Sequence, residues 1–389
     1  MCRPQKRLNL NNSRSAFVVI ALLPALSGCT TIEDYFAQRS GAVAGVPVVE
    51  LQERPVEEPL DPNRFVLSSA GQSVIGAPQV VFPNANDTLS DFAREYGLGY
   101  DELLEANPDV NPWLPGENTP ILLPTQYVLP DVPREGIILN IASKRLFYFP
   151  QMGEGQEQIV LTYPIGIGRV GWETPLGSSK VISKAKDPSW WVPLSVRKEH
   201  AELGDPLPSV VPPGPENPLG HRVLKLDMPG YLIHGTNQPY GVGMRVSHGC
   251  VRLYPENIEF LYELVDIGEL VVIVNEPYLL AEQDGEWFFE SHTPLEDDAV
   301  DPEARLTDLL TAAGEAMSPP LQAQARSVAS VANGMPVRLN QYDADEILAR
   351  VRRVRNTIEV NPDAPTLEEV REMIDEAVAE AEAESEDAG

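Results

Sequence analysis

Two short runs in this chain carry the side chains best suited to nucleophilic chemistry. They are Ile233-His234-Gly235-Thr236-Asn237 and Ser247-His248-Gly249-Cys250-Val251-Arg252-Leu253. A thiol must become a thiolate before it attacks a carbonyl carbon, and a nearby imidazole can accept its proton. Cys250 is therefore the predicted nucleophile of an acyl transfer, and His234 and His248 are the two candidate bases.

The spacing of these residues predicts how they meet. His248 and Cys250 would share one face of an extended segment, because alternate side chains of a strand point to the same side. His234 ends a predicted strand, and the glycines that follow it suit a tight hairpin that returns beside Cys250. Backbone N–H groups around Gly249 and Cys250 could form an oxyanion hole. Arg252 could bind a substrate carboxylate or lower the thiol pKa.

Residue types alone leave three other interpretations open. Cys250 could be an inert buried thiol, since free cysteine is among the most buried residue types. His234, His248 and Cys250 could instead bind zinc as a three-ligand set. A histidine here could also be a polar group that is simply hydrogen-bonded near a core. The catalytic thiol is favoured, but neither the inert thiol nor the metal site is excluded.

The N-terminus predicts export. Residues 1–28 combine a basic leader with an apolar run, 16–26, that is too short to span a membrane, as in a signal peptide. The run Leu26-Ser27-Gly28-Cys29 resembles a bacterial lipobox, in which the thiol of Cys29 receives lipid and becomes the first residue of the mature chain. This resemblance implies a lipid-anchored protein of the periplasm. Thr30 after the cysteine favours the outer membrane of a Gram-negative bacterium.

Composition limits the partners. The formal net charge is -29 over 389 residues, so no basic stripe exists to bind nucleic acid. The same charge argues against adhesion to anionic lipid without a hydrophobic anchor. Of the three cysteines, Cys2 lies in the leader and Cys29 would be lipidated. Cys250 is then a lone thiol in an oxidising compartment, which marks it as a candidate reactive group.

Two segments precede the region of the two runs. Residues 29–77 are rich in Pro, Gly, Ser and Glu without a sustained period, and predict a tether. Residues 78–124 predict a small unit in the order strand, helix, helix, strand. Its expected elements are a strand at 80–82, a helix capped by Asp87 and Thr88, a helix at 101–106 and a strand at 121–124.

The rest of the chain changes character twice. Several short strands with Gly and Pro turns in residues 133–275 favour a mainly β, sandwich-like domain, with residues 276–292 as a short β extension. One helix is expected from Pro255. The Pro-rich segment 205–220 is expected to be irregular, either a lid or an ordinary surface loop. Residues 293–389 predict an acidic, partly helical C-terminal appendage.

The two runs together resemble the signature of YkuD-type L,D-transpeptidases, the ErfK/YbiS/YcfS/YnhG-like family that forms and remodels bacterial peptidoglycan. Residues 78–124 similarly resemble a LysM domain, which grips the N-acetylglucosamine of peptidoglycan. The resemblance covers about residues 78–292. It implies a LysM peptidoglycan-binding domain followed by a YkuD catalytic domain.

The resemblance also implies a role for individual residues. Cys250 matches the nucleophile, and His234 matches the general base and acid, with its ring oriented by the backbone carbonyl of Gly235. His248 matches a supporting histidine near the thiol. The positions that bind substrate are Arg252, Ser247 and Gly249. Neither a metal nor a cofactor is implied.

The implied reaction is a two-step acyl transfer on peptidoglycan. The thiol attacks the bond between meso-diaminopimelate and the terminal D-Ala of a tetrapeptide stem, releases D-Ala and passes the acyl group to an amine. The acceptor could be an amine of another stem, giving a 3→3 cross-link, or of a Braun-type lipoprotein, and it could also be a free D-amino acid or water. The competing interpretation is a non-catalytic peptidoglycan-binding lipoprotein that acts through the LysM unit.

Overall fold

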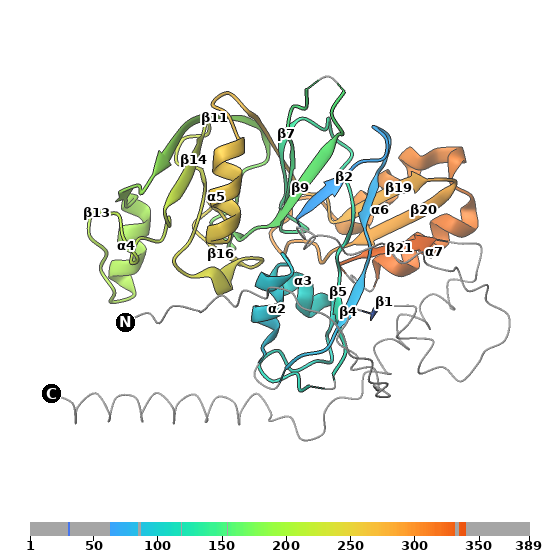
Figure 1. The fold of residues 1–389 in the computed structure, drawn as a ribbon, viewed down its shortest axis with the longest axis horizontal. Helices are drawn as coiled ribbons and strands as arrows, with labels where there is room; N and C mark the ends of the chain where they lie inside the picture. The colour runs from blue at the N-terminus through green and yellow to red at the C-terminus, as the bar shows by residue number, and fades with distance from the viewer. Residues whose placement is uncertain are drawn as a thin grey trace, which may run out of the picture.

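A nine-stranded mixed sheet runs through the centre of the molecule (Figure 1), in the order β17-β15-β14-β11-β18-β7-β8-β9-β2. The computed structural model describes residues 30–31, 63–84, 87–117, 119–153, 155–330 and 334–339. The strands of the sheet are β2 (Arg64–Val66), β7 (Gly136–Asn140), β8 (Arg145–Phe149), β9 (Ile159–Pro164), β11 (Gly177–Lys186), β14 (Arg222–Leu226), β15 (Leu232–His234), β17 (Val251–Arg252) and β18 (Leu270–Val274).

Strand β11 curls the sheet. Its first residues pair with β18, and after a register shift beyond Val181 the remainder pairs with β14. An irregularity of this kind bends the strand that carries it and increases the local twist. The prediction of a mainly β domain is confirmed, but these strands form one curled sheet and not a sandwich.

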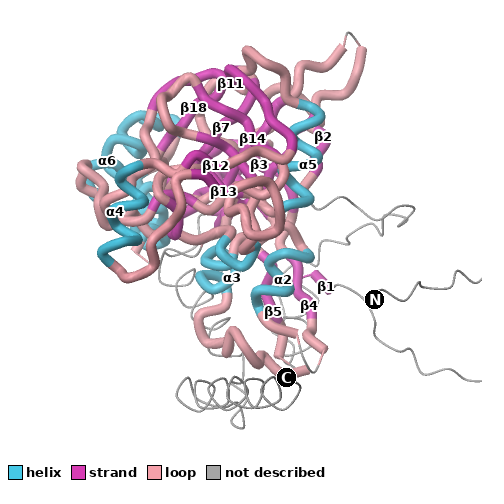
Figure 2. Tube along the Cα trace, turned by 90° about the vertical axis from the view of Figure 1, so that its left-hand side faces the viewer, coloured by secondary structure: helices cyan, strands magenta, loops and turns pink. Residues whose placement is uncertain are grey.

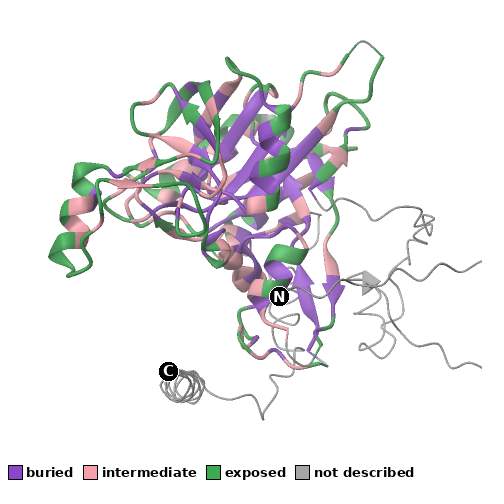
Figure 3. Cartoon of the chain, turned by 60° about the vertical axis from the view of Figure 1, so that its left-hand side comes forward, coloured by how far each residue is buried: buried purple, intermediate pink, exposed green. Residues whose placement is uncertain are grey.

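Strands β7 and β8 are buried at every position. Strands that are apolar at successive positions must be covered on both faces. On one face, Ile137 and Leu139 belong to a core shared with α5 (Pro255–Leu264), which begins at the expected proline. On the other face, Ile138 and Phe147 belong to a second core. Figure 3 shows these central strands as the most continuously buried part of the molecule.

The second core is completed by residues 78–124. Their elements follow the expected order: β4 (Gln79–Val81), α2 (Leu89–Glu95), α3 (Tyr100–Ala106) and β5 (Ile121–Leu123), with β4 antiparallel to β5. Helix α2 starts at the expected cap, where Thr88 and Asp91 exchange side-chain to backbone hydrogen bonds. Apolar side chains of this helical unit pack on the sheet, and Figure 2 shows both helices against the strands.

The prediction that residues 29–77 form a tether is wrong from Asn63 onward. Strand β2 pairs with β9 at the edge of the main sheet. Strand β3 (Val74–Gly76) pairs with β6 (Gln126–Val128), and β1 (Thr30–Thr31) pairs with β4. Each strand has only two or three residues, so its sequence is too short to show the alternation that marks a strand.

The C-terminal part forms a unit of its own. Its antiparallel sheet is β19 (Tyr278–Gln283), β20 (Glu286–Ser291) and β21 (Pro336–Leu339), covered by α6 (Pro302–Ala313), η2 (Gly314–Ala316) and α7 (Pro319–Ala329). Phe289 of the sheet and Leu306 of α6 share its core. The prediction that residues 276–292 form a short β extension of the catalytic domain is therefore wrong, because they form strands of this separate sheet, on which the helices of the tail pack. The helices expected near Asp343 and Thr366 lie outside the described residues.

An excursion of the chain between β11 and β14 projects from the sheet at the left of Figure 1. It contains β12 (Trp190–Trp191), α4 (Leu194–Glu202) and β13 (Val210–Val211), and β12 pairs with β13. The Pro-rich segment 205–220 thus includes one short strand. Buried Asn217 holds the rest of it, because its amide donates to the carbonyls of Pro188 and Pro212. Within the described ranges, no helix is long and apolar enough to cross a bilayer.

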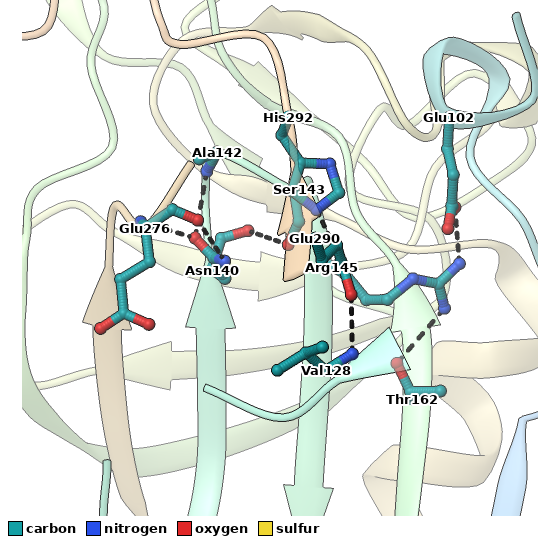
Figure 4. Close-up of polar contacts among 10 residues, drawn as sticks. All are labelled: Glu102, Val128, Asn140, Ala142, Ser143, Arg145, Thr162, Glu276, Glu290 and His292. Carbon is teal, nitrogen blue, oxygen red and sulfur yellow. Dashed lines mark hydrogen bonds and ion pairs between the residues drawn. The ribbon is translucent and has the colours of Figure 1, made fainter. Parts of the chain in front are cut away.

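Buried polar groups join the three units where they meet (Figure 4). Arg145 of β8, which is 1% exposed, donates to Glu102 of α3 at 2.6 Å and to Thr162 of β9 at 3.2 Å. Glu290 of β20 accepts a hydrogen bond from the backbone N–H of Val128 at 2.6 Å. Buried charged side chains therefore tie the helical unit to the main sheet, and the C-terminal unit to strand β6.

Candidate active site

Two neighbouring strands place Cys250 and His234 on one face of the main sheet. Strands β15 and β17 run parallel, with Ile233 beside Val251 and His234 beside Arg252. Ile233 and Val251 point into the core shared with α5. Because side chains alternate along a strand, His234, Cys250 and Arg252 point to the opposite face. The prediction that the chain brings the thiol of Cys250 and the imidazole of His234 together is therefore confirmed.

The route between them differs from the expected hairpin. After His234 the chain passes through η1 (Pro239–Gly241) and β16 (Arg245–Ser247), which pairs in parallel with β10 (Ile167–Gly168). It then enters β17 in the same direction as β15. The hairpin prediction is wrong, because the intervening residues pair with a different strand instead of with β15.

His234 is buried, and the backbone orients its ring. Nδ1 lies 2.6 Å from the carbonyl oxygen of Gly235. A carbonyl only accepts hydrogen bonds, so Nδ1 carries the proton and Nε2 presents a lone pair. Burial and the positive charge of Arg252 lower the pKa of His234 to about 3. The ring is thus neutral at physiological pH and able to accept a proton, as a general base must.

Cys250 is half-buried, and its Sγ lies 3.6 Å from the carbonyl oxygen of Gly230. Burial raises the pKa of the Cys250 thiol, against the opposing effects of the Leu232 backbone and the charge of Arg252. The resting thiol is therefore protonated at neutral pH, and nucleophilic attack requires a base that removes its proton. Neutral His234 on the same face of the sheet meets that requirement.

Ser247 and Gly249 shape the turn that presents the thiol. The Ser247 hydroxyl donates to the carbonyl oxygen of Cys250 at 2.5 Å and accepts from the N–H of Gly249 at 3.1 Å. Gly249 has a φ of +99°, and a Cβ there would lie 3.0 Å from Cε1 of Tyr231, so only glycine fits. Ser247 is 1% exposed, so it positions the turn from inside, and the substrate-binding role predicted for it stays a prediction. The Gly249 N–H is also occupied and does not serve the predicted oxyanion hole.

His248 faces the excursion. Its Nε2 lies 2.8 Å from Glu199 of α4 and 3.0 Å from Nη2 of Arg169. The positive φ of Gly249 interrupts the extended backbone, so the alternation that was expected to align His248 with Cys250 does not hold here. In the described part of the chain, no group of three or more ligating side chains could hold a metal ion, so the zinc interpretation gains no support. The supporting role of His248 at the thiol stays a prediction.

Arg252 lies next to the thiol on β17 with its guanidinium half-buried. Its buried Nε has no hydrogen-bond partner among the described residues. Burial lowers the pKa of Arg252, and its backbone is fixed by two hydrogen bonds with Gly166, of 2.8 and 2.9 Å. A guanidinium held in this way beside the nucleophile is available to bind an anionic group of a substrate.

Comparisons with known proteins agree with this geometry. A family model described as YkuD, the L,D-transpeptidase catalytic domain, matches residues 134–273. The probable L,D-transpeptidase YcfS of Escherichia coli (strain K12) is 37% identical over 293 residues, which are 73% of this chain and 90% of that protein. The chain belongs to the L,D-transpeptidase family. It is an enzyme, and its reaction class is that of this family.

One further relative and one solved structure are also similar to parts of this chain. The probable L,D-transpeptidase YbiS of the same strain is 41% identical over 235 residues, 59% of this chain and 75% of that protein. A solved catalytic domain of the E. faecium L,D-transpeptidase is 21% identical, with a TM-score of 0.28, over 37% of this chain and 99% of that domain. The matched family model includes all of the predicted site residues except Cys29.

The active site of this L,D-transpeptidase also depends on contacts that the sequence analysis missed. The loop between His234 and Cys250 packs against the segment that joins α2 to α3. Tyr100 N donates to Val242 O at 3.3 Å, and a Cβ on Gly243 would lie 2.3 Å from Cα of Gly99. These partners lie far apart in the chain, so no local pattern marks them as neighbours.

A second contact with the loop between His234 and Cys250 comes from the C-terminal side. Arg245 of β16 pairs with Asp297, which follows the C-terminal hairpin, at 2.6 Å. Arg245 also donates to the carbonyl oxygen of Gly168 at 3.2 Å. The loop that leads to Cys250, the predicted nucleophile, is therefore held between the helical unit and the beginning of the tail.

A cavity of about 430 Å³ lies between the Pro-rich segment and the residues that follow Gly235. Its lining includes Thr236 and Asn237, which follow Gly235, together with Asp187 and residues of the Pro-rich segment 205–220. The Pro-rich segment thus shares a cavity with the residues that follow Gly235.

The pKa values of the thiol and the imidazole predict how alkylation of Cys250 by iodoacetamide depends on pH. The rate should rise with pH to beyond the ordinary range for a thiol, because only the thiolate reacts and burial raises the pKa of Cys250. No step should occur between about pH 5 and 8, where a histidine usually titrates, because the pKa of His234 is lowered to about 3. Peptide mapping separates Cys250 from Cys2 and Cys29. A rate that is already constant below about pH 7 would contradict this expectation.

Proposed function

We propose that this L,D-transpeptidase acts on the tetrapeptide stems of peptidoglycan. Cys250 attacks the carbonyl that links meso-diaminopimelate to the terminal D-Ala. The observation that carries the proposal is the neutral imidazole of His234, with Nδ1–H on the Gly235 carbonyl, on the same sheet face as the thiol. Arg252, beside the thiol and without an ion-pair partner among the described residues, supports an anionic substrate.

The reaction takes two acyl transfers. Nε2 of His234 takes the thiol proton as Sγ bonds to the carbonyl carbon. The C–N bond then breaks, and His234 returns the proton to the departing D-Ala amine, which leaves a thioester on Cys250. An acceptor amine attacks the thioester and passes its proton to His234. The C–S bond breaks and the thiol is regenerated with that proton.

The acceptor and the setting complete the proposal. The acceptor amine belongs to the diaminopimelate of a second stem, giving a 3→3 cross-link, or to a lysine of a Braun-type lipoprotein. Residues 78–124 act as a LysM unit that binds the glycan, which is supported by their β-α-α-β order and the antiparallel pairing of β4 with β5. A lipid on Cys29 holds the enzyme in the periplasm, at the outer membrane of a Gram-negative bacterium.

Incubation of the purified enzyme with disaccharide-tetrapeptide tests the proposal. Release of D-Ala is expected, together with an enzyme species heavier by the acyl fragment, which peptide mapping places on Cys250. Enzyme that binds peptidoglycan but releases no D-Ala would support the non-catalytic alternative. Mass spectrometry of wall fragments from a strain that lacks the enzyme separates the two acceptors, because either 3→3 dimers or attached lipoprotein will be missing.

A further inference from the structure

Lys225 lies on the same face of the main sheet as Cys250. In the pairing of β14 with β15, Lys225 stands beside Leu232, and the preceding residue Leu224 stands beside Ile233. Leu224 points into the core shared with α5. Lys225, its neighbour along the strand, therefore points to the opposite face, where the thiol lies.

A row of side chains crosses the sheet from the thiol to this lysine. Because Ile233 is paired with Val251, Leu232 is the lateral neighbour of Cys250, and Lys225 is the lateral neighbour of Leu232. Adjacent strands are about 4.8 Å apart, so the backbones of Cys250 and Lys225 are separated by about 10 Å. Arg252 instead lies two residues after Cys250 along the chain, on the same face of the sheet. Two cations thus flank the thiol, one along the strand and one across the strands.

Lys225 is also unpaired. Its side chain is exposed, and it makes no hydrogen bond or ion pair with any described residue. Two lysines of the neighbouring strand β11 have partners: Lys184 donates to Val265 O at 2.6 Å, and Lys186 pairs with Glu263 at 2.9 Å. An unpaired cation in a chain with a net charge of -29, directed at the reaction site, is suited to bind an anionic part of a ligand.

We propose that Lys225 is a specificity-determining residue that pairs with a carboxylate of the donor stem remote from the bond being broken. This inference rests on the proposed function. The stem offers two such carboxylates, one on the D-Glu that precedes diaminopimelate and one at the far end of the diaminopimelate side chain. Two residues of an extended stem peptide span about 7 Å. This distance from the attacked carbon matches the point that the Lys225 side chain can reach from the far end of the row. Arg252 is placed for a carboxylate closer to the attacked carbon.

Steady-state kinetics of D-Ala release test the pairing. Lys225→Ala is expected to raise KM about tenfold with kcat within about twofold, because the carboxylate is bound equally before and during the reaction. Lys225→Arg keeps the charge and should restore KM. Lys186→Ala is the matched control, since it removes the same charge from the neighbouring strand β11, on the opposite face of the sheet. Its KM should equal that of the wild type.

Amidated substrates identify the carboxylate. One stem is amidated at D-Glu and another at the diaminopimelate side chain. Only one of the two should show a higher KM than the native stem with the wild-type enzyme. With that stem, Lys225→Ala should cause no further increase in KM. An unchanged KM in Lys225→Ala, or the same increase with the native and both amidated stems, overturns the inference and leaves the proposed function intact. Absence of D-Ala release by the wild-type enzyme from every stem overturns both.

Discussion

Replacement of Cys250 by alanine is expected to reduce D-Ala release by about 10³-fold or more, because the thioester can no longer form. The fold should survive, since Cys250 is half-buried and its Sγ makes only a long contact, 3.6 Å, with Gly230 O. Release of D-Ala and the thermal unfolding temperature, measured on the same preparation, separate these two effects.

The controls for this variant lie on the same chain. Cys29→Ala removes a thiol from the proposed lipidation site, and the purified variant should keep full activity on soluble muropeptides. His234→Gln keeps a polar side chain but removes the base, so it should also lose most of the activity while the thiol remains open to alkylation at high pH. Substantial D-Ala release by Cys250→Ala would refute the covalent mechanism.

Replacement of Arg145 by methionine is expected to lower the free energy of unfolding by about 3–5 kcal/mol, the cost of breaking a buried ion pair on one side. The guanidinium and the Glu102 carboxylate are 2.6 Å apart, with 2% and 8% of their side chains exposed. The Glu102 oxygen also accepts from the N–H of Gly99, so the loss would leave a buried carboxylate without its countercharge. Urea denaturation of the purified protein measures the change.

Two comparisons make this second prediction specific. The Arg94–Glu256 pair joins the same two units at 2.8 Å but is about half exposed, so Arg94→Ala should cost at most about 1 kcal/mol. The double variant Arg145→Met with Glu102→Leu should recover much of the loss, because no unpaired charge remains buried. A change of less than about 1 kcal/mol in Arg145→Met would show that the buried pair does not hold the junction.

The sequence predicts the chemistry of the site better than its architecture. The thiol, the imidazole and the cap of α2 are local signals: a motif, or a Thr88 with an acidic residue three positions later. The parallel arrangement of β15 and β17, the strands within the predicted tether and the bracing of Gly243 by Gly99 depend on pairing between distant segments. Strands of two or three residues show no period, and nothing local selects their partners.

The predicted positions of side chains fail for a different reason. His248 belongs to the motif, but a single glycine with positive φ redirects the turn, so His248 faces Glu199 and not the side of Cys250 that alternation along a strand suggested. Lys225 could have been found only from the register of three strands, because its sequence surroundings carry no signal of a binding site.

The two-sided burial of β7 and β8 determines how this enzyme can be divided. A fragment that begins at residue 133 would keep the whole matched catalytic region but would lose the side chains that cover Ile138, Phe147 and Phe149. That fragment would expose a continuous apolar surface to water and would self-associate. The smallest soluble form should therefore start before Asn63, and the region that carries the chemistry is not a module that can be transplanted to another protein by itself.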